Sequence, residues 1–516
     1  MKALRKKRWW ILALVLATPI LLLTGAHLQG KWALSRLRRD LTARGEKLLV
    51  EENEPQAPRR SNGEFRELMF LVSRIKGAEV GILCPPMGRQ PEPGKLVPLH
   101  WLTNWPTGRA RSNATWTVLT TALASSSNLL GEAQLLLKAP LPAAHLDYHL
   151  GFNMLLPHLA SLKGFAQHLS GAVAESLQAG RLDLAKDQLR DLLAVGDLLK
   201  SEPILISQLV RCSIVAIGVQ TTWQALQVPG WTDEQLLDLQ RTWQAVDMLP
   251  EMMAALEMER AIVLESYGSM RRSPAVLTQY LGMGGGPSSS PGNAPGSLGE
   301  LIDQLTGNAA EVATQHVLLP IWQFSFSYGD EAHYLKSMQF LIESGRTCAK
   351  QRSAEPIREA KRRIEEAAAA EGALAHVRHL MSRNFFGALV NSIDKALGAE
   401  TQKEIVLAAI AVQRYTLRYG HPPGRLEELV PQWADRLPHD YWAGNALSYA
   451  ANSNAAPRLY SVGPDGRDAG GNPTNDATVK NPALFTGRDM VWPVAVTETE
   501  LPAALKALGC NTNDMR

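Results

Sequence analysis

The chain has few aromatic residues and few cysteines. Aromatic side chains make up 6% of its 516 residues, and its four cysteines are more than 100 residues apart, with no CxxC pair. This spacing excludes a disulfide framework and the usual zinc-binding patterns. We expect core thiols, or at most one or two long-range disulfides, from Cys84, Cys212, Cys348 and Cys510.

The familiar catalytic signatures are also missing. The chain contains no GxSxG elbow, no phosphate-binding Walker loop and no dinucleotide fingerprint. His145 and His149 are four residues apart, so on a helix they would share a face and could bind a metal. Leu146 stands where a zincin has its general base, which leaves a structural or surface role as the simpler interpretation. Four acidic residues between 251 and 265 share their segment with methionines, which is typical of an ordinary amphipathic helix. They are Glu251, Glu257, Glu259 and Glu265.

Neither sign of charge dominates overall, but the charge is unevenly distributed. The chain has 53 basic and 50 acidic residues, of which residues 1–50 hold 11 and 2, so the other 466 residues carry 42 and 48. The basic excess flanks a hydrophobic segment instead of covering a folded domain. We therefore expect no nucleic-acid partner.

One long hydrophobic run is present at the start of the chain. Trp9 to Gly30 contains no formal charge and follows five basic residues within Met1–Arg8. At about 1.5 Å per residue, a helix of this length spans the roughly 30 Å hydrocarbon core. The sequence predicts a signal anchor over residues 1–30 that crosses a membrane once. The basic N-terminus would be cytoplasmic and the body periplasmic, although the basic residues after Gly30 weaken this orientation.

A cleavable signal peptide is the alternative for this segment. Small residues at Thr24-Gly25-Ala26 could form a cleavage site. The apolar stretch is longer than the usual signal-peptide core, which favours retention as an anchor.

The rest of the chain is predicted to be mainly α. We expect a juxtamembrane helix and Pro-rich irregular structure over 31–115, then a large helical bundle or irregular solenoid over 116–397 with a flexible Gly/Ser/Pro loop at 282–298. A turn at Gln178–Arg181 predicts a helical hairpin, and Thr232 is expected to cap a following helix. After Tyr419 the composition changes to Gly, Asn, Asp and Pro, so we place a small α+β domain at 398–516.

The order of motifs in this last region resembles the soluble part of the major pseudopilin of type II secretion systems. A helix ending at Tyr415-Thr416-Leu417-Arg418-Tyr419-Gly420 is followed by Pro422-Pro423, then by Leu459-Tyr460-Ser461-Val462-Gly463-Pro464-Asp465-Gly466 and finally by Asp489-Met490-Val491-Trp492. The similarity covers about 90 residues. The chain lacks the pseudopilin's N-terminal Gly-Phe-x-x-x-Glu pattern, so the resemblance implies a pilin-like fold without pilin-like polymerisation. The whole arrangement is similar to membrane-anchored bacterial envelope proteins.

The resemblance also implies a calcium site. The pseudopilin loop holds Ca²⁺, and the matching carboxylates here are Asp465, Asp468 and Asp489, on a glycine-rich backbone that can bend around a cation. The alternative is a hairpin turn at Asp465-Gly466 with no metal.

These features predict a membrane-anchored extracytoplasmic protein with a binding or scaffolding role and no enzymatic activity, associated with a type II secretion or pilus-like assembly. The alternative is a metal-dependent envelope enzyme with its site in the helical domain, at His145 and His149.

Overall fold

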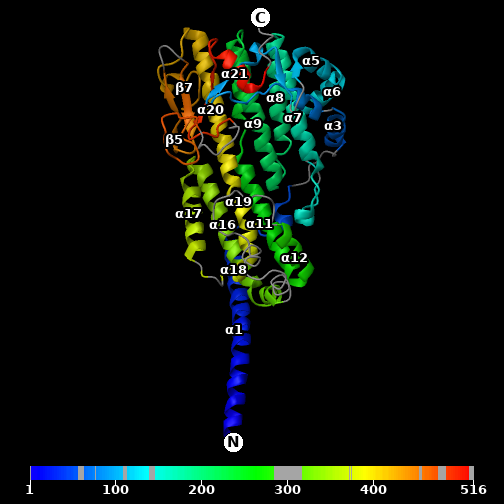
Figure 1. The fold of residues 1–516 in the computed structure, drawn as a ribbon, viewed down its shortest axis with the longest axis vertical. Coiled ribbons are helices and arrows are strands. Elements are labelled where there is room, and N and C mark those ends of the chain that lie inside the picture. Colours follow the sequence, from blue (N-terminus) through cyan, green and yellow to red (C-terminus); the bar gives the residue numbers. More distant parts are fainter. Residues whose placement is uncertain are drawn as a thin grey trace.

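The computed structural model describes residues 2–55, 63–75, 77–107, 113–138, 144, 146–283, 317–370, 372, 375–451, 456–474 and 484–510. Of α1, side chains are described from Ala17 onward. The protein is mainly helical, which confirms the predicted class. Most of the long helices run along the long axis of the body, and α1 projects from one end as a single rod (Figure 1).

The helices of the first half of the chain are α1 (Lys2–Ala43), α2 (Val50–Asn53), α3 (Gly63–Arg74), α4 (Gly77–Leu83), α5 (Trp116–Ala124), α6 (Ser127–Leu137), α7 (Pro157–Gln178), α8 (Leu182–Asp197), α9 (Leu205–Gln227) and α10 (Asp233–Gln244). Those of the second half are α11 (Leu249–Arg272), α12 (Pro274–Met283), α15 (Leu319–Ile321), α16 (Ser327–Gln351), α17 (Glu355–Ala370), α18 (Ala375–Arg378), α19 (Leu380–Val390), α20 (Ser392–Tyr419) and α21 (Leu501–Leu508). Three short 3-10 helices are described, η1 (Leu99–Trp101), η2 (Tyr148–Asn153) and η5 (Leu426–Leu429), and η4 (Trp322–Phe326) is a π-helix.

The predicted hairpin is confirmed by α7, α8 and α9. Gly180 adopts a positive φ of 71° in the turn between α7 and α8, a conformation that glycine takes without strain. The apolar stripe of α8 is buried, including Leu189 and Leu192. Thr232 caps α10 as expected, because its side chain accepts a hydrogen bond from the N–H of Gln235.

Helices α9, α11 and α20 form the centre of the body. Helix α9 packs against α7, α8 and α20, and α11 packs against α16, α9 and α20. Residue 398, where we expected the last domain to begin, lies inside α20. One continuous hydrophobic core extends from Leu34 to Cys510, so the segments on both sides of residue 398 share the same interior.

The strands are short and join distant parts of the chain. They are β1 (Lys95–Leu96), β2 (Asn104–Pro106), β3 (Asn113–Thr115), β4 (His439–Asp440), β5 (Asn445–Ala446), β6 (Ser448–Ala450), β7 (Arg458–Ser461), β8 (Met490–Val491) and β9 (Val494–Ala495). The largest sheet has the antiparallel order β6-β7-β8, and β1 pairs in parallel with β9. Trp223 of α9 donates a hydrogen bond to the carbonyl of Pro493, 2.8 Å away, which attaches the C-terminal strands to the helical body.

The expected loop at 282–298 lies outside the described residues apart from its first two positions, which end α12. Helix α17 carries a charged, solvated face, on which Arg362 pairs with Glu366 and Arg363 with Glu359, each at 2.6 Å. All four cysteines are free thiols; Cys348 and Cys510 are buried, and the other two are partly buried. Burial of its sulfur raises the pKa of the Cys84 thiol to about 12, which disfavours the reactive thiolate.

Candidate functional site

The most exposed apolar surface in the described part of α1 lies where the helix leaves the body. Ile20, Leu21 and Leu22 are 64%, 70% and 69% exposed, whereas Leu34 and Leu41, further along the same helix, are buried. Leucine and isoleucine side chains on all sides of a helix are stable only when another apolar phase covers them. Within the described side chains, α1 thus has an exposed apolar part around Ile20–Leu22 and a part that packs into the body.

The body contacts α1 at His27, and the two pack most closely from Gly30 onward. A Cβ atom placed on Gly30 would lie 2.6 Å from the backbone nitrogen of Gly329 in α16, so two glycines allow the two helices to touch through their backbones. From this crossing the helices run in the same direction, because the contacts of α1 with α16 advance together along both sequences, from Gly30 beside Gly329 to Arg44 beside Glu343. This glycine crossing marks the level at which the projecting segment ends.

Two buried carboxylates, Asp330 and Glu331, directly follow Gly329 in α16. Glu331 is fully buried and forms ion pairs with Arg38 of α1 and Arg271 of α11. Its neighbour Asp330 accepts hydrogen bonds from Trp322 Nε1 and from the backbone N–H of Met381, both at 2.8 Å. These contacts connect α1, α11, α16 and the start of α19.

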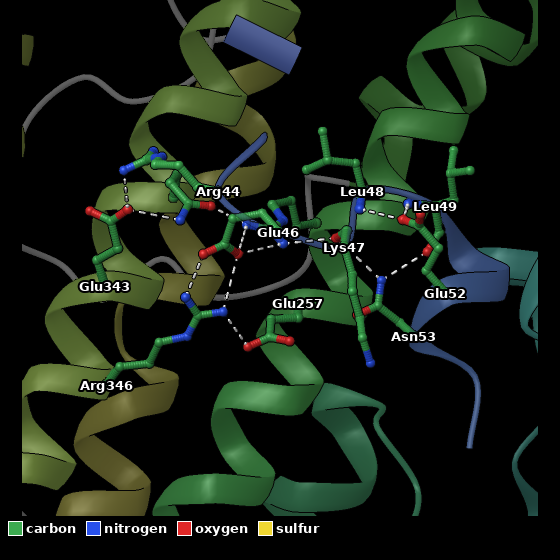
Figure 2. A network of polar contacts seen from close by, with 12 residues as sticks. Arg44, Glu46, Lys47, Leu48, Leu49, Glu52, Asn53, Glu257, Glu343 and Arg346 are labelled. Carbon is green, nitrogen blue, oxygen red and sulfur yellow. Dashed lines mark hydrogen bonds and ion pairs between the residues drawn. The ribbon is translucent and has the colours of Figure 1, made fainter. Parts of the chain in front are cut away.

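A second polar network holds the segment that follows α1. Glu46 contacts Arg346 of α16 at 2.6 Å and the fully buried Arg260 of α11 at 3.1 Å. Arg346 also pairs with Glu257 of α11, at 2.7 Å. Figure 2 shows Glu46 between the two helices, with the guanidinium of Arg346 pointing toward both Glu46 and Glu257. We call Glu46, Glu257, Arg260 and Arg346 the Glu46 network.

The electrostatics of this network favour ionised Glu46. Burial acts to raise the pKa of Glu46, but the hydrogen bond from Arg346 and the charges of Arg346 and Arg260 outweigh it and lower the pKa to about 2. Burial is also the main influence on Arg260 and lowers its pKa, while Glu46 opposes that effect. Glu46 is therefore the counterion of a buried guanidinium.

The chain turns immediately after this network and caps a new helix. The side chain of Glu52 accepts hydrogen bonds from the backbone N–H groups of Leu48 and Leu49, at 2.8 and 3.0 Å (Figure 2). Arg260 also donates to the carbonyl of Lys47, at 2.8 Å. The junction between the projecting helix and the body is thus held by both side-chain and backbone contacts.

The predicted calcium ligands lie in the loop between β7 and β8. Asp489 is almost fully buried, and its two oxygens accept hydrogen bonds from the N–H groups of Ala469 and Asn472, at 3.2 and 2.7 Å. Asp465 and Asp468 are exposed. Each carboxylate accepts a hydrogen bond from the backbone N–H two residues later in the chain, that of Arg467 and that of Gly470. Asp489 therefore organises the loop through backbone hydrogen bonds.

The histidine pair of the alternative enzyme hypothesis is described only in part. His145 lies outside the described residues. His149 belongs to the short turn η2, which begins at Tyr148, so the helical four-residue spacing does not apply to the pair. Its Nδ1 lies 3.5 Å from Glu265, and its Nε2 lies 3.8 Å from Glu51.

Within the ranges that the structure describes, no three His, Cys, Asp or Glu side chains gather into a group that could hold a metal ion. Asp465, Asp468 and Asp489 do not form such a group in the described structure. The calcium site stays a prediction.

The acidic residues of α11 differ more than the sequence indicated. Glu257 belongs to the Glu46 network, whereas Glu259 is buried and accepts a hydrogen bond from the N–H of Leu205 at the start of α9. Burial raises the pKa of Glu259 to about 7. Their spacing on α11 could have shown only that the two side chains point in different directions.

By length and composition alone, α9 is the one candidate membrane span among the described residues, and half of its apolar stretch is buried inside the body.

Comparison with known proteins adds no relative: no family model, no curated protein and no solved structure matches the chain.

Proposed function

We propose that the chain is a membrane-anchored extracytoplasmic scaffold or binding protein. Trp9–Gly30 of α1 crosses a bacterial inner membrane once, with the basic N-terminus in the cytoplasm and the body in the periplasm. The observation that carries this proposal is the division of α1 into an exposed apolar part that includes Ile20, Leu21 and Leu22 and a part that packs most closely against the body from Gly30 onward.

The dimensions agree with a single crossing. Helix α1 has 42 residues, which correspond to about 63 Å at 1.5 Å per residue. The 22 uncharged residues from Trp9 to Gly30 account for about 33 Å of this length, slightly more than the hydrocarbon core. The basic residues before Trp9 and after Gly30 would then face the two headgroup layers.

A scaffolding role is supported by how α1 enters the body. The helix continues without a break from the projecting segment to Ala43. Glu331 and the Glu46 network then connect it to α11 and α16, two long helices of the body. A connection of this kind would fix the orientation of the body relative to the membrane, as a scaffold could use.

The partner in this proposal is a type II secretion or pilus-like assembly, on the basis of the motif order in the C-terminal region. Removing the chain from a cell that carries such an assembly should reduce export of its substrates. Unchanged export would contradict this part of the proposal and leave the anchoring unaffected.

Membrane extraction tests the anchoring directly. We expect the full chain to stay in the membrane pellet at alkaline pH and the double variant Leu21→Arg/Leu22→Arg to be released, because each central arginine opposes insertion by about 2.5–3.5 kcal/mol. Leu135→Arg is the matched control, since Leu135 is 63% exposed but lies on α6 of the body. Release of the parent chain would overturn the proposal.

Calcium binding is a separate part of the proposal. Calcium at about 100 times its dissociation constant should stabilise the full chain by roughly 2.7 kcal/mol. The change should be absent in Asp465→Ala and be measurable as a calcium-dependent shift in thermal unfolding against EDTA. An equal shift in both proteins would show that the ion binds elsewhere.

A further inference from the structure

We infer that residues 317–326, which include α15 and η4, lie in the headgroup region of the membrane beside α1 and give the body a second contact with lipid. We call this segment the membrane-facing turn. The inference rests on the proposed anchoring by α1 and adds a lipid-binding surface on the body itself.

The membrane-facing turn is apolar on both of its sides. Its sequence, VLLPIWQFSF, contains no charged residue. Leu319 and Trp322 point into the core and are buried, whereas Val317 and Phe324 are 52% and 59% exposed. A helical segment that is hydrophobic all round is stable when protein covers one side and a second apolar phase covers the other.

The position of Phe324 sets the level of this surface relative to the membrane. The ring of His27 in α1 stacks on the ring of Phe324 with 5.4 Å between centroids and 26° between planes, and its Nδ1 contacts the carbonyl oxygen of Phe324. His27 lies three residues before Gly30, about 4.5 Å along the helix. If Trp9–Gly30 crosses the membrane, Phe324 therefore lies at the depth of the last turn of the span, close to the membrane–water interface.

The remaining contacts of the turn hold it at this end of the body. Gln323 donates a hydrogen bond to the carbonyl of Met270, 2.7 Å away, close to the end of α11. The turn also contacts α1 and α18, and α18 lies where α1 leaves the body in Figure 1. The turn is thus attached to three helices and cannot move away from α1 without breaking these contacts.

Charge at the edge of the turn suits an anionic lipid surface. Lys31 and Arg272 are exposed, at the end of the apolar segment of α1 and the end of α11. The acidic residues that follow the turn, Asp330 and Glu331, are buried and directed to partners inside the body. Cations at the rim of an apolar surface attract the phosphates of lipid headgroups.

Photocrosslinking in lipid nanodiscs tests the inference on the full chain. A p-benzoylphenylalanine residue is placed at position 324, 22 or 417 in three separate proteins, and the adducts are identified by mass spectrometry. Position 22 lies in the proposed span, and position 417 is a similarly exposed apolar site near the end of α20 (Leu417, 47% exposed). We expect lipid adducts at 324 and 22 and none at 417.

Each other outcome has a distinct meaning. Lipid adducts at 22 but not at 324 would overturn the inference and leave the anchoring intact, whereas no lipid adduct at 22 would overturn the anchoring itself. Adducts from 324 to peptides of residues 284–316, to a second copy or to another protein would show that protein covers the turn. Equal lipid adducts at 324 and 417 would show unspecific labelling and would also overturn it.

Discussion

Removing the charge of Glu46 should destabilise the junction between α1 and the body. In Glu46→Gln, Arg260 stays fully buried but loses the carboxylate that lies 3.1 Å from its guanidinium. At an effective dielectric constant of about 20, two charges at this distance attract by roughly 5 kcal/mol, and desolvation offsets part of that energy. Breaking a buried pair from one side costs about 3–5 kcal/mol. We expect about 3 kcal/mol here, because Arg346 keeps Glu257 as a partner.

The matched control is Glu343→Gln. Glu343 pairs with Arg44 at 3.2 Å in the same region, but both side chains are about half exposed. Exposed ion pairs contribute about 0.2–1 kcal/mol to stability. The stability lost in Glu343→Gln should therefore be about 1 kcal/mol or less. Hydrogen exchange of residues 44–53, followed by mass spectrometry, measures the local opening energy. A change of about 3 kcal/mol corresponds to roughly a hundredfold faster exchange. Equal effects of the two variants would refute the argument that Glu46 neutralises a buried charge.

The same residue should give a pH dependence with a defined sign. Because the folded state lowers the pKa of Glu46 from 4.5 to about 2, its stabilisation is present above pH 4.5 and is lost as the pH falls toward 2. Part of the network is exposed to solvent, so we expect a loss of about 2 kcal/mol for this group. Glu46→Gln should lack this part of the acid sensitivity.

Three further changes test other parts of the structure. Gly30→Ala should weaken the packing of α1 by about 1–3 kcal/mol, because the added Cβ meets the backbone of Gly329, whereas Gly25→Ala meets nothing within 4 Å and should change stability by less than about 1 kcal/mol in thermal unfolding. Glu259 should have the opposite pH dependence to Glu46. Because its pKa is raised to about 7, the stability of the folded state should fall by up to about 3 kcal/mol as the pH rises from 4.5 to 7. Denaturation curves measured over a pH series should lack this decrease in Glu259→Gln. Asp489→Asn should lower the stability of the C-terminal loop by about 1–3 kcal/mol, detected as faster hydrogen exchange at residues 469–472, and unchanged exchange would mean that the loop does not depend on this carboxylate.

Local sequence signals predicted the helical elements well. The turn at Gln178–Arg181 identified the α7–α8 hairpin, and Thr232 identified the start of α10. These signals depend on residues within one or two helical turns of each other, which is the range over which periodicity and capping operate.

The contacts that organise α1 could not be predicted in this way. Glu46 is 214 residues from Arg260 and 300 residues from Arg346, and no local pattern joins them. The change in composition after Tyr419 suggested a separate domain. Composition could not show that α20 packs into the body beside α9 and α10. Helix spacing on α11 did not distinguish Glu257 from the buried Glu259 for the same reason.

Protease protection is the most direct test of the central claim that α1 anchors an extracytoplasmic body. Spheroplasts that contain the full chain are treated with protease before and after lysis, and the chain is detected through a tag placed before Lys2. We predict that protease degrades the body in intact spheroplasts and leaves a short protected N-terminal fragment that includes Trp9–Gly30. Protection of the whole chain until lysis would contradict the proposed topology, and recovery of the chain in the soluble fraction would contradict the anchor itself.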